Sequence, residues 1–197
     1  MVNAPGEPRS LRTLLDGRAT LSAVTAYLDG LTPAARLHEA RELPPLGLDI
    51  LWEISAAAPP LTVSHVLPPS RAAHHALRWV GRSTRPPFRQ LELPCFQDEH
   101  GRVWGRVVPA YDLMATVVGP MYFAVTAHPE WPGEVCLSFD RVPDTAPPGW
   151  PEIRQHGRTS ALMLQGVPDR LRGAAAGVLV GRAEATGAHS ILVVVED

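Results

Sequence analysis

Lysine is absent from this chain of 197 residues, and its 18 basic residues are all arginine. Because arginine stays protonated, it cannot form a Schiff base or act as a neutral general base. The sequence therefore excludes pyridoxal-phosphate enzymes with an internal aldimine, lysine-dependent aldolases, Walker-type nucleotidases and protein kinases. The arginine bias and the 21 prolines are typical of a bacterial gene rich in G and C.

Cysteines and long apolar runs are also scarce. The two cysteines, Cys95 and Cys136, are too few for a disulfide framework, and both fall among apolar residues, where cysteine behaves as a small hydrophobic residue. No stretch reaches the roughly 18 apolar residues of a membrane span. The first residues lack the apolar run of a signal peptide. We therefore expect a soluble, cytoplasmic protein with reduced thiols and no membrane partner.

Length and composition predict one globular domain. A chain of this size with 45% hydrophobic residues can bury a core without a disulfide or metal. The net charge of -2 does not indicate a nucleic-acid or membrane partner. We expect residues 1–8 to be disordered and residues 9–197 to form a single α+β domain. Its helical part is predicted at 9–57 and its β-rich part at 58–197.

Capped segments with helical spacing fill the N-terminal part. Thr20 is a good N-cap for the helix that follows it. The Thr32-Pro33 pair is a second strong start, a cap followed by proline at the first helical position. The Pro44-Pro45 pair ends that segment and opens a third helix. This part of the chain is therefore predicted as a series of short helices.

After Ala57 the pattern changes to period-two alternation. Residues 88–96 place Leu91, Leu93 and Cys95 on one face, and alternation resumes at 102–108, which predicts a hairpin. Thr186-Gly187 predicts a second hairpin at 178–195. Further strands are predicted at 113–118, 121–127, 134–139 and 159–165, a short helix at 167–176, and a surface loop held by Trp150 at 142–151.

This order of elements predicts the architecture. Roughly eight mostly antiparallel strands must cover their edges or close on themselves. We expect an α+β fold with N-terminal short helices packed on a curved, mostly antiparallel β-sheet or small β-barrel, at one end of it.

Three stretches resemble a family of bacterial proteins that has no assigned activity. They are VVGPMYFAV at 117–125, EVCLSFDRVPDTAPPGWP at 134–151 and the closing VGRAEATGAHSILVVV. The shared features are a Gly-Pro-x-Tyr-Phe element, a Pro-Gly-Trp-Pro loop and a terminal hairpin at similar spacing, over about the C-terminal half. The chain departs from this pattern at Met121, where a glycine is expected. The resemblance implies a β-rich fold and no particular function.

The titratable residues form no recognisable catalytic or metal motif. None of the eight histidines has a partner at His-x-x-x-His spacing, and no Cys-x-x-Cys occurs, so we expect no metal site and no cofactor. A Gly-x-Ser-x-Gly elbow is absent as well. Cys95 is the better candidate nucleophile of the two cysteines because it ends a strand near the turn that holds His100. Catalytic residues stay unassigned.

The most unusual feature of the sequence is a segment without acids. Residues 54–91 contain no Asp or Glu, but five arginines with Trp79 and Phe88 among them. Arginine forks match carboxylate and phosphate, and aromatic rings can stack on a ligand. Alternatively, these arginines pair with acids elsewhere or cover the sheet with their stems. Nucleic acid is disfavoured because the whole chain is slightly acidic.

A small-molecule binding module is the leading functional hypothesis. A curved sheet naturally forms a pocket lined by alternate strand residues, for a ligand that is partly apolar and either neutral or anionic. The predicted ligand-binding residues are Arg78, Arg82, Trp79, Trp104 and Tyr122. Further candidates for the pocket lining are Met114, Met121, Phe123 and Phe139, which could equally fill a solid core.

Two other classes stay open. One is a small metabolic enzyme, of cyclase or hydrolase type, that uses His with Asp or Cys; its sign is a polar cluster inside the pocket. The other is a scaffold or partner-binding subunit, whose sign is a large exposed apolar patch. The sequence does not indicate the oligomeric state.

Overall fold

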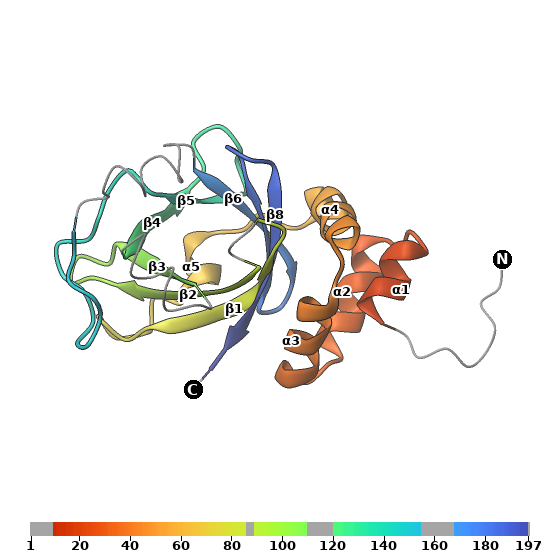
Figure 1. Ribbon diagram of the computed structural model, residues 1–197, viewed down its shortest axis with the longest axis horizontal. Helices are drawn as coiled ribbons and strands as arrows, with labels where there is room; N and C mark the ends of the chain where they lie inside the picture. The colour runs from red at the N-terminus through yellow and green to blue at the C-terminus, as the bar shows by residue number, and fades with distance from the viewer. Residues whose placement is uncertain (1–9, 86–88, 110–119, 155–167, 197) are drawn as a thin grey trace.

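The computed structural model describes residues 10–85, 89–109, 120–154 and 168–196. Within them, eight strands form a closed barrel with helices against its side (Figure 1). The helices are α1 (Leu11–Asp16), α2 (Leu21–Asp29), α3 (Pro33–Glu42), α4 (Pro45–Ile54), the 3₁₀ turn η1 (Ser55–Ala57) and α5 (Val63–Val66). The strands are β1 (Leu77–Ser83), β2 (Gln90–Gln97), β3 (Val103–Pro109), β4 (Met121–Ala127), β5 (Val135–Ser138), β6 (Asp169–Ala175), β7 (Val178–Ala183) and β8 (Ala188–Val195).

The barrel is an antiparallel meander. Each strand pairs with the next one in sequence, and β1 pairs with β8 from Arg78↔Val195 to Ser83↔Ser190, which closes the sheet. Closure removes the exposed strand edges that an open sheet would present. The α+β fold with a small antiparallel barrel is therefore confirmed. Both predicted hairpins are present, as β2–β3 and β7–β8.

The helices begin where the sequence predicts. The side chains of Thr20 and Thr32 accept hydrogen bonds from the backbone N–H groups of Ala23 and Ala35, and α4 begins at Pro45. None of the helices in the described part of the chain is long and apolar enough to cross a membrane.

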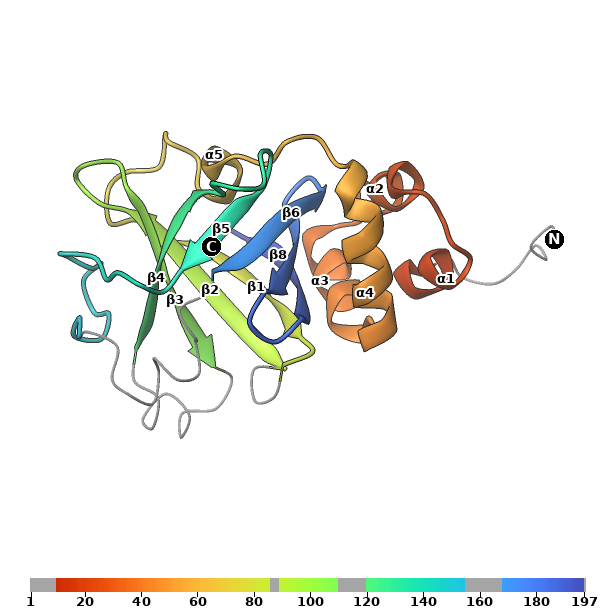
Figure 2. The same ribbon diagram turned by 90° about the horizontal axis from the view of Figure 1, so that it is seen from above.

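The helical part packs against the side of the barrel, over β6, β7, β8 and β1 (Figure 2). An apolar layer joins the two parts, because strand residues that point out of the barrel meet the apolar faces of α1–α4. It includes Leu28, Leu51, Val180, Ile191 and Val193, all 0–1% exposed. The expectation that the helices lie at one end of the barrel is wrong for α1–α4.

Among the described helices, α5 and the residues around it cover a barrel end (Figure 2). Leu61, Val66 and Leu67 belong to the apolar core inside the barrel. The indole N–H of Trp79, inside the barrel, donates a hydrogen bond to the Val66 carbonyl at 3.0 Å. Apolar side chains therefore fill this end.

Two strands differ from the sequence prediction. The helix predicted at 167–176 is wrong, because β6 occupies residues 169–175. Leu171 points into the barrel while Arg170 and Arg172 point outward, and pairing with β5 and β7 outweighs the helix propensity of the alanines. Strand β1 was not predicted. The N-terminal residues 1–8 and the predicted strands at 113–118 and 159–165 lie outside the described residues.

Candidate functional site

A cavity of about 70 Å³ opens in the barrel at the end away from α5. Strands β1, β3, β5 and β7 finish at this end, and β2, β4, β6 and β8 begin there. The floor is apolar and includes Leu93, Met121, Leu137, Phe139, Leu171 and Leu192. Polar side chains line it nearer the mouth: Ser83, Arg85, Asp169 and Ser190.

Strand alternation and small residues produce this cavity. Asp169 and Leu171 stand two residues apart on β6, so both side chains point into the barrel. On β7 and β8 the inward positions near the mouth are small: Gly181, Ala183, Ala188 and Ser190. A Cβ atom at Gly181 would lie 2.6 Å from the Ser190 Oγ, so larger residues there would fill the space. The room inside the mouth is therefore a property of the β7–β8 hairpin.

Asp169 has the most unusual electrostatics in the cavity. The residue as a whole is half-buried, and the burial of its carboxyl group raises its pKa from 3.8 to about 7. The positive charge of Arg85 acts in the opposite direction, and the negative charge of Glu184 adds to the rise. Near neutral pH the carboxyl group therefore exists in both forms. It can donate a hydrogen bond when protonated and accept one when ionised.

The guanidinium group of Arg85 places a positive charge at the mouth of the same cavity. Its backbone N–H donates to the Ser83 side chain at 3.1 Å, which holds the chain as it leaves β1. Ser83 pairs with Ser190 of β8, so the two hydroxyl groups lie on neighbouring strands at the mouth. The mouth thus combines a carboxyl group, a guanidinium group and two hydroxyl groups above an apolar floor.

The two predicted arginines lie on the outer face of the barrel wall. Arg78 forms an ion pair with Glu92 of β2, with 3.0 Å between Nε and Oε1. Arg82 donates to the backbone carbonyl of Arg41, near the end of α3, at 2.9 Å. Both side chains therefore make protein contacts, and neither lines the barrel cavity.

The three predicted aromatic residues lie apart from each other. Trp79 is in the core near α5. Trp104 and Tyr122 point outward from β3 and β4 and are buried under the 142–151 loop: Trp104 donates to Asp98 at 3.0 Å, and the Tyr122 hydroxyl donates to the Pro151 carbonyl at 2.7 Å. The structure does not bring the five predicted residues together in one site.

Three of the other residues that were predicted to line a pocket lie inside the barrel. Met121 and Phe139 line the cavity, and Phe123 lies in the barrel core in edge-to-face contact with Phe139 at 5.6 Å. Met114 lies outside the described residues. Sequence reasoning missed Asp169, and it placed Arg85 in the acid-free arginine segment without choosing it as a ligand-binding residue. The signal for Asp169 was the alternation of Asp169, Leu171 and Gly173 against Arg170 and Arg172, which the alanine-rich end of the segment concealed.

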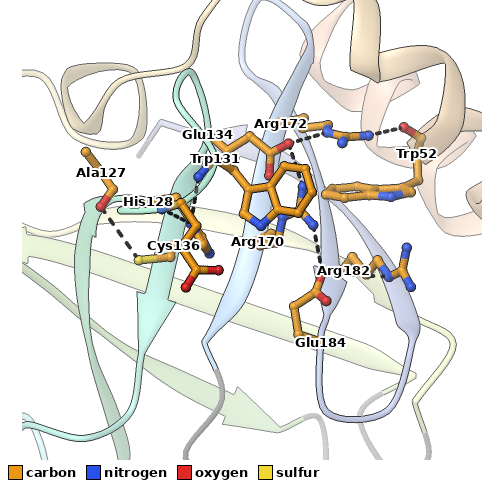
Figure 3. Close-up of polar contacts among 11 residues, drawn as sticks. Trp52, Ala127, His128, Trp131, Glu134, Cys136, Arg170, Arg172, Arg182 and Glu184 are labelled. Atoms are coloured by element: carbon orange, nitrogen blue, oxygen red, sulfur yellow. Dashed lines mark hydrogen bonds and ion pairs between the residues drawn. The ribbon is translucent and has the colours of Figure 1, made fainter.

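A second polar cluster lies outside the barrel (Figure 3). Arg170 is 6% exposed and makes a bidentate ion pair with Glu134, at 2.6 and 2.8 Å, and a further contact with Glu184 at 3.2 Å. Arg172 joins Glu134 at 2.8 Å and also donates to the carbonyl of Trp52, at the end of α4. Burial favours a higher pKa for Glu134, but the two arginines outweigh it and lower the pKa.

Aromatic rings complete this cluster. The Arg170 guanidinium lies 4.0 Å from the ring centre of Trp131, and the Arg172 guanidinium lies 3.9 Å from that of Trp52. Cation–π contacts of this kind stabilise a desolvated arginine. Because each charged group has partners and Arg172 reaches α4, the cluster joins the helical part to the barrel.

Histidines and cysteines lie outside the cavity lining in the described part of the chain. His189 Nδ1 contacts the Asp49 carboxylate at 2.6 Å, but this pair lies between β8 and α4. Cys95 and Cys136 are buried free thiols, as predicted, and burial raises the pKa of Cys95 to about 12. Among the described residues, no group of three or more His, Cys, Asp or Glu side chains could hold a metal ion.

Comparison with known proteins finds no match for this chain. No family model matches the chain, and neither a curated protein nor a solved structure matches it.

Proposed function

We propose that this protein is a small-molecule binding module whose site is the cavity in the barrel mouth. The ligand is partly apolar: it buries an apolar group on the floor and places one polar group beside Asp169 and Arg85. The observation that carries the proposal is a carboxyl group with a pKa of about 7 in an apolar cavity that opens at the barrel end.

General properties of barrels, of binding sites and of buried carboxyl groups support the proposed binding function. An eight-stranded barrel has an interior just wide enough for side chains or one small ligand. Binding sites are typically apolar with a few placed polar groups, and strongly perturbed carboxyl groups concentrate at functional sites. A buried carboxyl group that lowers the stability of the fold is easiest to explain when it serves a ligand.

The two alternative classes have less support. The cyclase or hydrolase alternative predicts a histidine in reach of Cys, Asp or Glu inside the pocket, whereas the described pair His189–Asp49 lies outside the barrel. A scaffold needs a large exposed apolar patch. The large hydrophobic residues that are exposed in the described part of the chain are Leu46 and Trp131, which lie on different elements.

The test is an NMR titration of methyl-labelled protein with n-butanol, a neutral amphiphile of suitable size. We expect saturable shifts confined to Met121, Leu137, Leu171 and Leu192. The variant Ala188→Phe, which fills the mouth, should abolish them, and Ala183→Leu is the second choice if that variant melts early. Ala26→Phe is the control, because Ala26 is exposed on α2. Shifts that survive in the filled cavity, or no shifts in the parent protein, would refute the proposal.

A further inference from the structure

The cavity mouth gives information on the chemical class of the ligand. We propose, resting on the binding function above, that the ligand is a short-chain monocarboxylate whose carboxylate lies beside Arg85 and protonated Asp169 and whose alkyl chain fills the apolar floor.

The size of the cavity limits the alkyl chain. An apolar cavity of about 150 Å³ is known to bind benzene, and this one has a volume of about 70 Å³. It therefore has room for roughly three or four carbon atoms. A longer molecule would leave its remaining carbons outside the mouth, where they gain little from burial.

The donors at the mouth favour an anionic head group. Arg85 carries five N–H donors in a planar fork, which suits a carboxylate even while it makes other contacts. Ser83 and Ser190 add two hydroxyl groups. An ammonium head group would instead lie beside the like charge of Arg85.

Asp169 decides how the binding depends on pH. Two carboxyl groups at close range hold one proton between them, because both cannot be ionised at low cost. With its pKa of about 7, Asp169 needs little free energy to take up that proton. The charged groups that act on it from neighbouring elements of the described chain are Arg85 after β1 and Glu184 after β7; on the β5 side, Leu137 and Phe139 are apolar.

Binding of the carboxylate is coupled to the uptake of one proton by Asp169. The ligand arrives as the carboxylate, Asp169 takes one proton from solvent, and no other bond changes. Above pH 7, affinity should fall by about tenfold per pH unit, since each bound ligand requires a proton that the free site no longer holds. Between pH 6 and 7 it should change little.

The experiment compares three probes of equal chain length: n-butyrate, n-butanol and n-butylamine. We expect n-butyrate to bind most tightly at pH 6.5 and about 25-fold more weakly at pH 8.5. Calorimetry in two buffers of different ionisation enthalpy should show uptake of close to one proton at pH 8. From acetate to butyrate, affinity should rise about fourfold per methylene group and then level off.

Two variants separate the contribution of Asp169 to n-butyrate binding from that of Arg85. Asp169→Asn should bind n-butyrate with an affinity that does not change between pH 6.5 and 8.5, because its amide donates without titrating. Arg85→Gln should weaken n-butyrate at least tenfold and leave n-butanol unchanged. The control is Arg89→Gln, because Arg89 is exposed before β2.

Each other outcome counts against the inference. Tighter binding of n-butylamine than n-butyrate would overturn it, as would a pH dependence that persists in Asp169→Asn. If n-butanol shifts the cavity methyl groups but n-butyrate does not, the ligand class is wrong and the binding function stands. If none of the three probes shifts them, both proposals fail together.

Discussion

Asp169 pairs with Ala183 across β6 and β7, which places an ionisable carboxyl group and a methyl side chain at the same level of the barrel mouth. The neighbouring pair, Arg170 and Arg182, points outward. The small partner leaves room above the apolar floor. This arrangement makes an ionised Asp169 costly to the fold and places it in the lining of the cavity.

Asp169→Asn should stabilise the protein in a pH-dependent way. The folded pKa of about 7 lies above the unfolded value of 3.8, so the ionised group destabilises the fold progressively from about pH 4 to pH 7. Full ionisation costs about 4 kcal/mol, to order of magnitude. Asp169→Asn should therefore unfold at higher urea than the parent protein at pH 8 and at nearly the same urea at about pH 3.5. An equal effect at both pH values would show that the cause is not ionisation.

Asp98 should contribute stability that is lost in acid. It is 4% exposed. Burial favours a higher pKa, but hydrogen bonds from Trp104, Arg102 and His100 outweigh it and lower the pKa from 3.8 to about 2. The folded value lies below the unfolded one, so about 2–3 kcal/mol is present above pH 4 and lost as the pH falls toward 2. Asp98→Asn should remove it, which thermal melts from pH 2 to 7 can measure. A melting profile with the same pH dependence as the parent protein would contradict this.

Glu134→Gln should destabilise the fold strongly. Removal of its charge leaves Arg170 and Arg172 buried without their shared carboxylate, which typically costs about 3–5 kcal/mol. Arg154→Ala is the matched control, because its pair with Glu152 is more than 70% exposed and should contribute under about 0.5 kcal/mol. Denaturant unfolding measures both variants. Similar values for the two would show that the cluster does not join the parts of the fold.

Arg82→Ala should cost about 1–2 kcal/mol, because Arg82 hydrogen-bonds the Arg41 carbonyl between β1 and α3. Arg78→Ala should cost under about 1 kcal/mol, since its pair with Glu92 is partly exposed. Neither variant should change n-butanol binding. Weakened binding with unchanged stability would instead support the predicted ligand site on the outer wall.

Much of the fold could be predicted from local patterns. Capping threonines indicate the starts of α2 and α3, and the alternation of Leu91, Leu93 and Cys95 indicates β2. Strand β1 was hard to recognise because Arg78 and Arg82 occupy its outward positions and give it a polar composition. Strand β6 ends in alanines with high helix propensity, and only its pairing with β5 and β7 decides its conformation.

The candidate site was much less predictable than the fold. Arg78, Arg82 and Trp79 share β1, but strand alternation sends the arginines outward and the tryptophan inward. Asp169 and Arg85 are more than 80 positions apart in sequence and meet only because the barrel closes through β8. Local sequence patterns do not reveal that closure, so the sequence alone does not distinguish Asp169 from the other acidic residues.

The most direct test of the cavity site is the carboxyl ¹³C shift of Asp169, followed by NMR against pH with and without saturating n-butyrate. The account predicts a midpoint near pH 7 in the free protein and a midpoint at least about two units higher with n-butyrate. Asp98, measured in the same spectra, should titrate near pH 2 and be unaffected. A midpoint of Asp169 near pH 4 that no probe moves would contradict the account.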